Sequence, residues 1–517
     1  MRIRFPALIL LLTLVLSACG QPAAQPTPAP KPAPPPAVKP ITIALTTDAT
    51  TLDPAYTTVS NENTLYYYLF DTLLCRAADG KLELSLAESY KALDDKTWEF
   101  KLRKDVKYHN GEPFNAECVK FTFDRMLDPA EKCPSAGHYS TVKEVKVVDE
   151  YTVQIITGAP DPLIPARLKS LSIVPVKYVK EKGKEYFARN PIGTGAYVFK
   201  EWVKDSHITM EANPNYFKGV PQYPKVVFKP IPEYATRVSV LRTGEVDVIT
   251  NIIPGQADTL AKEPNIVIHK SPTLRTMMLL MRPDLGPLKK KEVRQASNYA
   301  IDKESIVKNV LGGYAQVAKG QVLGPMYFGY NPNLQAYSYD LDKAKKLLSS
   351  AGYPNGFEID LYTPAGRYTL DKEIAEAISA QLAKVGIKAK IQPFEWGLYS
   401  KLQQEKKFGH LNLFAFMQTT YDAEGILYSL FFKDQIWGVG PYWSNPEVDR
   451  LTLLARGTVD PKVREDSFQK ALAIIREEAP VVFLHHMMEI YGVKKGIDFT
   501  PRPDEILDIF TAGLKKK

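Results

Sequence analysis

The sequence predicts an α/β protein of two or three domains, on the basis of length, composition and alternating strand and helix patterns. Its 517 residues are enough for several domains of ordinary size. A hydrophobic content of 45%, an aromatic content of 11% and a mean hydropathy of −0.21 are typical of a soluble globular protein with a large core. Strand-like alternation and helix-like spacing of apolar residues follow one another along the chain, which favours mixed α/β structure.

The first residues have the features of a secretory signal peptide. Arg2 and Arg4 precede an apolar run over residues 5–16, and the small residues Ser17 and Ala18 follow it. Leu16 to Cys19, Leu-Ser-Ala-Cys, is similar to a bacterial lipobox. That resemblance implies a lipoprotein signal peptide at 1–18 and lipidation of Cys19. A plain signal peptide with an incidental cysteine is the alternative.

Residues 19–40 consist mainly of Pro, Ala, Gln, Thr and Lys, with three prolines at 34–36. Such a segment cannot bury a core and favours extended polyproline geometry, which rises about 3.1 Å per residue. We expect a semi-rigid tether between the lipidated Cys19 and the folded part. A ligand for SH3-type domains has a similar composition, but that use does not fit an exported protein.

The charge distribution does not indicate a nucleic-acid partner. The formal net charge is +8, with 66 basic and 58 acidic residues, and removal of Arg2 and Arg4 with the leader lowers it to +6. No basic block exceeds the terminal Lys515–Lys517. A mildly basic, solvated surface is therefore the expected reading.

The stretch from Leu84 to Asp128 predicts a strand, a turn and a helix. Trp98, Phe100 and Leu102 alternate with charged residues, as expected for a strand with one buried face. Asn110-Gly111 is a turn signal, and Asn115 can cap a helix with a broad apolar face that ends near Leu127.

The wording of this stretch, LAESY followed by TWEFKLRKDVKYHNGEPFNAECVKFTFDR, resembles the bacterial extracellular solute-binding proteins of family 5. These receptors deliver peptides, and sometimes nickel or oligosaccharides, to ABC importers. Cys118 departs from the family pattern, which has an acidic residue there. Two later segments, residues 190–219 and 241–250, are also similar to the family.

The resemblance spans about residues 41–510 and implies a periplasmic-binding-protein-like fold, a two-lobed clamshell of three domains with mixed sheets. Its first lobe is discontinuous. The implied division is 41–84 plus 190–282 plus 478–517 for lobe I, 85–189 for an inserted domain II, and 283–477 for lobe II (domain III).

A βαβ unit is predicted within lobe II. Phe357, Ile359 and Leu361 alternate as a strand, an amphipathic helix follows as far as Val385, and Gly386 ends that helix before a second strand over 387–391. The loop after the first strand contains Arg367. Ligands of open α/β sheets bind at the carboxyl ends of strands, so Arg367 is a candidate ligand residue.

The segment 413–431 resembles the ligand loop of the family. Phe416 stands at the position of its tryptophan, Asp422 at an acidic position, and Thr419 where dipeptide receptors carry the carboxylate that holds the peptide amino group. The last difference argues against a simple dipeptide specificity. The predicted ligand-binding residues are Asp422, Arg367, Thr419, Thr420, Tyr421, Phe416, Trp396 and Tyr56.

Asp422 and Arg367 form the hypothesis for recognition of a zwitterion, since aspartate accepts from an ammonium group and arginine donates to a carboxylate. The alternative is that Asp422 caps the following helix and Arg367 pairs with a nearby acid. If the ligand is a sugar, Trp396, Tyr421 and Phe416 would instead bind it by stacking.

The segment 477–496 resembles the strand that returns to lobe I, and we expect a hinge near Met277–Arg282 and Val481–Glu489. His485-His486-Met487-Met488 could suggest a nickel or copper site, but adjacent residues of a strand point to opposite faces. No metal site is therefore predicted. Of Cys75, Cys118 and Cys133, the last two could form a disulfide, and the sequence leaves this open.

The sequence contains no GxSxG, HExxH or phosphate-loop motif, and its Ser-x-x-Lys matches at Ser140 and Ser305 lack the partner motifs of serine hydrolases. We expect no enzyme and no cofactor. The resemblance implies a monomeric, exported receptor, lipid-anchored at the outer face of the cytoplasmic membrane or in the periplasm. It would capture peptides and pass them to a permease with separate ATPase subunits. An oligosaccharide or metal complex as ligand, and more remotely an exported hydrolase, are the alternatives.

Overall fold

The computed structural model of the chain describes residues 39–56, 60–433, 435, 438–511 and 513–514. The predicted signal peptide, Cys19 and nearly all of the Pro-rich tether lie outside the described residues. No described helix is both long enough and apolar enough to span a membrane. The names lobe I, domain II and lobe II are kept below for the three predicted parts.

One mixed sheet runs through both lobes. Its strands follow the order β15-β14-β16-β12-β17-β11-β1-β10-β9-β8, and β13 pairs with β17 beside this path. The sheet is mixed. Strand β1 pairs in parallel with β10 and β11, strand β14 pairs in parallel with β15 and β16, and the other neighbours are antiparallel. The strands of this sheet are β1 (Ile41–Leu45), β8 (Tyr197–Val203), β9 (His207–Ala212), β10 (Lys225–Pro230), β11 (Val248–Ile249), β12 (Ile266–Met281), β13 (Ala315–Val317), β14 (Phe357–Pro364), β15 (Ile387–Phe394), β16 (Leu411–Phe416) and β17 (Val481–Lys494).

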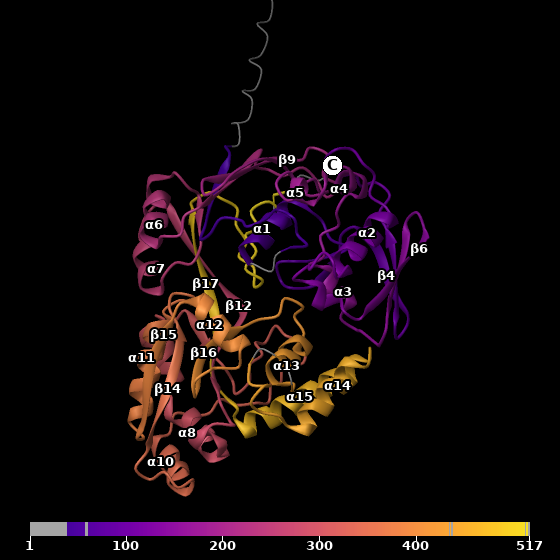
Figure 1. Cartoon of the computed structure of the whole chain (residues 1–517). Helices are drawn as coiled ribbons and strands as arrows, with labels where there is room; N and C mark the ends of the chain where they lie inside the picture. Colours follow the sequence, from indigo (N-terminus) through magenta and orange to yellow (C-terminus); the bar gives the residue numbers. More distant parts are fainter. Residues whose placement is uncertain (1–38, 57–59, 434, 436–437, 512, 515–517) are drawn as a thin grey trace, which may run out of the picture. The chain divides into compact units, whose positions relative to one another are not determined.

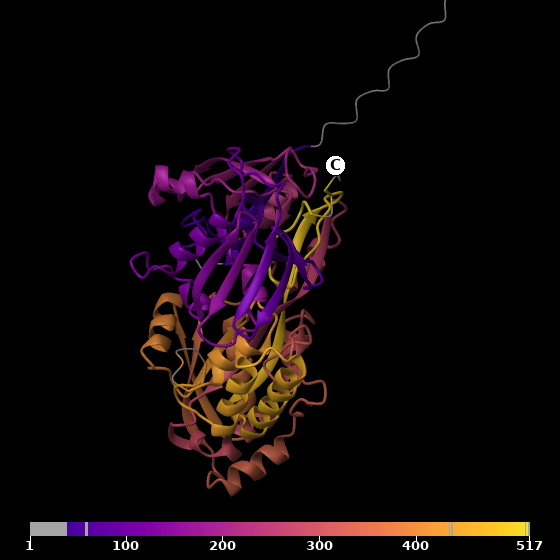
Figure 2. The same cartoon turned by 90° about the vertical axis from the view of Figure 1, so that its right-hand side faces the viewer.

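Strands β12 and β17 connect the lobes, and Figure 2 shows them running side by side along the molecule. Their antiparallel register shifts between Pro272 and Thr276 and again between Met277 and Met278. Before the first shift, Ile266 packs in a lobe I core, whereas Met277 and Met278 pack in the cores of lobe II.

The passage from one lobe to the other in β12 therefore precedes the predicted Met277–Arg282 hinge. Pro272 has no backbone N–H for the ladder, so the pairing is interrupted there. The apolar run after Thr276 already belongs to the lobe II sheet, where it pairs with β16.

Lobe I carries aromatic side chains between its sheet and helix α1 (Ser60–Leu69), with Tyr68, Tyr197 and Phe510 in mutual ring contact. The helix stops at Leu69, where the backbone N–H of Gly195 donates to the Leu69 carbonyl at 3.0 Å. The remaining elements of lobe I are β2 (Leu74–Arg76), β3 (Leu82–Leu84), α6 (Tyr234–Thr243) and α7 (Pro254–Leu260).

Domain II is built on a separate four-stranded antiparallel sheet of order β4-β5-β7-β6. Asn115 caps α2 as predicted, its side chain accepting from Glu117 N at 3.1 Å. The chain leaves the core of domain II after Ile173. The next buried side chains, those of Val174, Val179 and Phe187, pack with the lobe I core. The elements are β4 (Ala87–Asp94), β5 (Thr97–Leu102), α2 (Ala116–Leu127), β6 (Val142–Asp149), β7 (Thr152–Thr157), α3 (Ile164–Leu168), α4 (Val176–Lys182) and α5 (Lys184–Phe187).

The two buried cysteines of domain II are separate thiols, so the disulfide considered from the sequence is not formed. Cys118 lies in the first turn of α2 and donates to Asn115 Oδ1 at 3.6 Å, whereas Cys133 donates to the Arg125 carbonyl at 3.7 Å. Cys133 lies at Arg125, which is seven positions after Cys118 in the same helix. At a rise of 1.5 Å per residue this is roughly 10 Å along the helix, so the two thiols are held apart.

Lobe II contains the predicted βαβ unit. Strands β14 and β15 are parallel, α11 (Asp371–Ala383) connects them, and Gly386 adopts the left-handed φ of 88° that ends the connection. In Figure 1, α14 and α15 lie on the other side of this lobe from α11. The other helices are α8 (Lys291–Ala300), α9 (Lys303–Ser305), α10 (Leu341–Ser350), α12 (Trp396–Gln404), α13 (Ala423–Phe431), α14 (Pro446–Arg456) and α15 (Pro461–Glu478).

The close approach of the Gly193–Gly195 segment to α1 generates a prediction about stability. A Cβ atom at Gly193 would overlap the carbonyl oxygen of Leu69. We expect Gly193→Ala to lower the melting temperature by several degrees, because the backbone has to move, while Gly137→Ala, whose Cβ meets nothing within 4 Å, leaves it unchanged. Equal melting temperatures for the two variants in a thermal scan would contradict this account.

Candidate functional site

A cavity of about 1110 Å³ lies where lobe I, domain II and lobe II meet. Lobe I contributes Asp71 and Arg76, domain II contributes Lys169, and lobe II contributes Phe416 and Thr419. The volume slightly exceeds the usual range for small-molecule sites, which is about 300–1,000 Å³, and suits a ligand of several residues. The wall combines apolar and aromatic side chains with a few charged ones.

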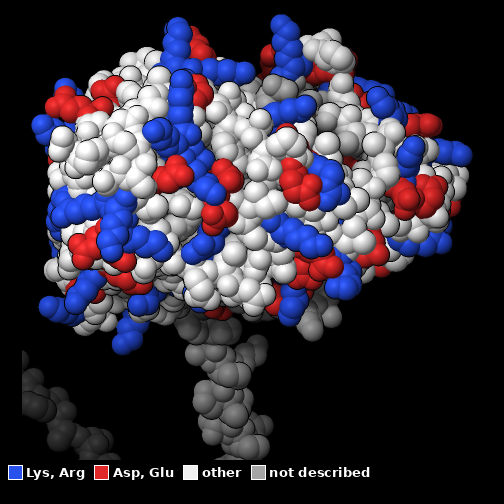
Figure 3. Space-filling view, turned by 90° about the horizontal axis from the view of Figure 1, so that it is seen from below, with Lys and Arg blue, Asp and Glu red and all other residues white. Residues whose placement is uncertain are grey.

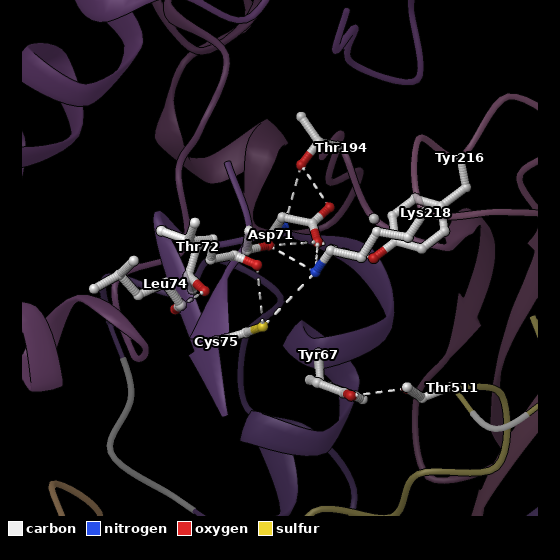
Figure 4. A network of polar contacts seen from close by, with 12 residues as sticks. Tyr67, Asp71, Thr72, Leu74, Cys75, Thr194, Tyr216, Lys218 and Thr511 are labelled. Carbon is white, nitrogen blue, oxygen red and sulfur yellow. Dashed lines mark hydrogen bonds and ion pairs between the residues drawn. The ribbon is translucent and has the colours of Figure 1, made fainter. Parts of the chain in front are cut away.

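Asp71 is the centre of a buried polar network on the lobe I wall, shown in Figure 4. Tyr216 and Ser85 donate to one carboxylate oxygen at 2.9 and 3.4 Å, and Thr194 donates to the other at 3.0 Å. The Lys218 ammonium lies 3.4 Å from the same carboxylate and donates to Ser85 at 2.7 Å. Asp71 is therefore fully occupied by groups of the protein itself.

A second network comes from the C-terminal segment. Arg502 donates to both oxygens of Asp504, at 3.0 and 2.9 Å, and its guanidinium lies 3.7 Å from Asp508. Burial opposes ionisation of Asp504, but the Arg502 guanidinium outweighs it and lowers the pKa of that carboxyl. Asp508 also accepts from Tyr67 at 3.0 Å.

Arg76, at the end of β2, joins lobe I to the predicted ligand loop. Its Nη1 donates to the Gly80 carbonyl at 2.6 Å, and its Nη2 donates to the backbone carbonyl of Thr420. The guanidinium also lies over the Tyr421 ring, 4.4 Å from the centroid. Burial lowers the pKa of this arginine.

A further ion-pair cluster joins domain II to lobe II. Arg167 pairs with Asp161 in its own domain and lies 3.7 Å from Glu424 at the start of α13. Arg456 reaches the same glutamate at 2.8 Å. Burial raises the pKa of Glu424, and the two arginines oppose that rise. The lobes are thus in contact through two charged links.

The predicted ligand residues do not all face the cavity. Phe416 and Thr419 line it, whereas Thr420 and Tyr421 lie behind them and contact Arg76. Tyr421 is 7% exposed, and burial raises the pKa of its hydroxyl above the usual range. The four residues follow one another from the end of β16 (Leu411–Phe416), and their role in ligand binding stays a prediction.

Arg367 and Trp396 contact each other outside the wall of this cavity. The guanidinium lies 5.0 Å from the Trp396 ring centroid and 5.5 Å from that of Tyr368. Within the described residues, Arg367 has no ion pair within 4 Å, so the acid partner considered as an alternative is not found.

Tyr56 is also away from the cavity wall. Its hydroxyl donates to Glu131, and its ring lies 5.4 Å from the Arg125 guanidinium at the interface with domain II.

Asp422 is in a structural setting. It is 5% exposed, caps α13 by accepting from Glu424 N at 2.9 Å, and accepts from Arg464 Nη2 at 2.9 Å. Burial raises the pKa of this carboxyl, and Arg464 opposes the rise. These contacts show the helix-capping alternative for Asp422, and its carboxylate is already paired with Arg464, so a ligand role for it stays an untested prediction.

Sequence reasoning missed the charged residues that line the cavity. They are Asp71, Arg76, Glu83, Arg103, Lys169, Lys218, Arg502, Asp504 and Asp508. Their sequence positions form no motif that marks them as ligand residues. A partial signal existed, because Tyr216 and Lys218 lie in the family-like segment 190–219.

The two histidines of β17 are buried in the strand pairing. His486 Nδ1 lies 2.8 Å from Thr276 Oγ1, and burial lowers its pKa to about 4. Burial and the neighbouring His486 lower the pKa of His485 to about 3. Among the described residues there is no group of three or more His, Cys, Asp or Glu side chains that could hold a metal ion.

On the face that Figure 3 draws, basic and acidic side chains are interspersed over the surface. This pattern is that of an ordinary solvated surface, and the drawn face has no continuous basic track of the kind that binds nucleic acid.

Comparison with known proteins identifies the family. Residues 81–438 match the bacterial extracellular solute-binding proteins, family 5. The chain belongs to this family. The heme-binding protein A of Haemophilus influenzae is 32% identical over 436 residues, covering 78% of this chain and 79% of the relative. The dipeptide-binding protein of Escherichia coli K12 is 31% identical over 442 residues, covering 80% and 82%.

Solved structures agree with this assignment and with the predicted two-lobed α/β fold. HbpA2 of Haemophilus parasuis superposes with a TM-score of 0.82 at 27% identity, over 93% of this chain and all of the other. The periplasmic binding protein DppA of Helicobacter pylori, in complex with the peptide STSA, gives a TM-score of 0.76 at 29% identity, covering 91% and 98%. These relatives are binding proteins by name.

The Asp422–Arg464 contact generates a prediction that separates structure from ligand binding. We expect Asp422→Asn to keep the helix cap but lower the free energy of unfolding by about 3–5 kcal/mol, because Arg464 is left buried without its charge partner. Urea denaturation checks this.

Asp466→Asn is the matched control, since its partner Lys462 is exposed and the pair contributes at most about 1 kcal/mol. A normally stable Asp422→Asn protein that binds the peptide trialanine tenfold more weakly than wild type would instead support the ligand role for Asp422.

Proposed function

We propose that this family 5 protein is the receptor of an ABC importer and captures a peptide or a peptide-like solute by closure of its two lobes. The observation that carries the proposal is the cavity of about 1110 Å³ with walls from lobe I, domain II and lobe II. A ligand in such a place contacts both lobes at once, so its binding energy favours the closed arrangement.

The chemistry of the wall supports a peptide-sized, partly polar ligand. Phe416, Phe217 and Tyr67 supply ring surface, while Gln418 and Thr419 supply groups that can bond to amides. Of the three aromatic residues considered for sugar stacking, Phe416 alone lines the cavity, but Phe217 and Tyr67 offer rings there too, so an oligosaccharide stays the alternative ligand. A nickel complex has no ligand cluster among the described residues.

We also propose that Cys19 is lipidated and holds the protein at the outer face of the cytoplasmic membrane or an equivalent envelope surface. The lipobox-like Leu-Ser-Ala-Cys and the Pro-rich segment after it support this. One acyl chain binds a membrane only marginally, so more than one chain is expected. The protein would act as a monomer and pass its ligand to a permease with separate ATPase subunits.

Ligand capture should change the separation of the lobes. Native mass spectrometry of the purified protein first identifies any ligand that copurifies, with trialanine, glutathione and heme as added probes. Small-angle scattering with the ligand that binds should then show a smaller radius of gyration. A shift from 99:1 open to 1:99 needs about 5.5 kcal/mol of preference for the closed state.

A second variant makes this test sharper. Arg76→Met removes the link to the Thr420 carbonyl and should reduce the fraction that closes at a given ligand concentration. Identical scattering with and without saturating ligand would contradict closure, and binding of none of the probes would contradict the peptide-like ligand.

The anchor is tested separately. Cys19→Ala should release the protein from the membrane fraction to the soluble fraction after cell lysis, because the acceptor of the lipid is lost. Cys75→Ala is the matched control and should stay with the membranes. Sedimentation of Cys19→Ala with the membranes would show that the protein is held in some other way.

A further inference from the structure

We propose that the ligand of this cavity bears a carboxylate or a similar anionic group and that Lys169 of domain II, with Arg76, is the site that binds it. The inference deepens the receptor function proposed above and rests on it. It assigns the chemical class of the ligand and a specificity-determining residue outside the family-like ligand loop.

Lys169 follows α3 directly, and α3 packs against β2, the strand that ends at Arg76. Both side chains line the cavity, together with the hydroxyl residues Ser170 and Ser172. Within the described part of the chain, no group accepts a hydrogen bond from Lys169 or pairs with it within 4 Å. Its three ammonium donors therefore remain available to a ligand.

The surroundings of Lys169 are cationic. The charged groups that act on it are Asp504, Arg76 and Arg502, and Asp504 already accepts two hydrogen bonds from Arg502. Asp508 also lies 3.7 Å from the Arg502 guanidinium, so Arg502 pairs with both of these carboxylates and neither forms an ion pair with Lys169. Burial, with the two arginines, lowers the pKa of Lys169 to about 8, so the side chain still carries its charge at pH 7.

Arg76 supplies a further unused donor. Its Nη1 and Nη2 bond to the Gly80 and Thr420 carbonyls, while its Nε is buried and makes no hydrogen bond to any described residue. The neighbouring Thr420 Oγ1 is buried and unpaired in the same way. A buried donor without a partner is destabilising, so a hydrogen bond from Nε to an anionic ligand group would be favourable.

The acidic residues of the wall do not offer a matching site for an ammonium group. Asp71 and Asp508 accept from several protein donors, and Glu83 lies on the exposed edge of β3. The lobe II wall contributes uncharged residues, Phe416, Met417, Gln418, Thr419 and Ser429. Glu83 lines the cavity without an ion pair to any described residue, but solvent screens its exposed charge, whereas the unused positive charge of Lys169 is buried and selects for a negative group on the ligand.

The test uses the full mature protein and trialanine in four forms: unmodified, N-acetylated, C-terminally amidated, and modified at both ends. Calorimetry on wild type should show that amidation weakens binding by at least about tenfold, whereas N-acetylation has little effect. Lys169→Met should bind the free acid about as weakly as wild type binds the amide, and should no longer distinguish the two.

Two further variants control for structural effects. Lys169→Arg keeps the charge and should retain the preference for the free acid, and Lys177→Met, an exposed lysine of α4, should behave as wild type. Thermal scans on each variant confirm folding. Equal losses on amidation in wild type and Lys169→Met, or a loss in wild type on acetylation alone, would overturn the inference.

The pH dependence gives an independent readout. N-acetyl-trialanine has no group that titrates between pH 7 and 10, so any change of affinity in this range comes from the protein. As the pH rises through about 8, Lys169 loses its charge and the affinity of wild type should fall, while that of Lys169→Met stays flat. A flat wild-type profile would count against Lys169.

Failure of the two proposals can be told apart. If none of the four peptides binds, the peptide part of the proposed function fails, and glutarate and citrate become the probes for the anion site. Binding of these anions that Lys169→Met abolishes would support the inference without a peptide. Failure of both anions as well would overturn it.

Discussion

The antiparallel pairing of β12 with β17 is the constraint on which the rest of the structure depends. These two strands belong to the sheets of both lobes, so each lobe completes its own core against one part of the same pair. The register shift between Pro272 and Thr276 interrupts the ladder between those parts. The closure proposed above would take place at this interruption, where the apolar contacts lie on both sides and each core can stay intact.

Charge pairing inside the protein decides what the cavity can offer a ligand. The carboxylates of Asp71, Asp504 and Asp508 are held by neighbouring donors, which offsets the cost of burying them. Lys169 has no ion pair within 4 Å among the described residues, and Arg76 Nε is a buried donor without a partner there. Groups of this kind are the ones that a ligand can satisfy. The positions of these groups therefore indicate the chemistry of the ligand better than the total charge of the wall does.

The sequence predicted local structure better than side-chain roles. The βαβ unit, the Asn115 cap and the family were within reach because they depend on periodicity, turn residues and a long motif. The ion pair of Asp422 could not be predicted from the sequence, because its partner Arg464 lies 42 positions later in an ordinary helix pattern. Lys169 was missed for the same reason: its role depends on which charges the fold places around it.

The link from Arg76 ends on a backbone carbonyl, that of Thr420, rather than on a side chain. Every residue has such a carbonyl, so the link does not depend on which amino acid occupies position 420. The loop that faces the ligand can therefore accumulate substitutions, and with them new ligand preferences, while the contact between the lobes stays available. Under the proposed closure, the residues that set specificity can change while the contact that joins this loop to lobe I is kept.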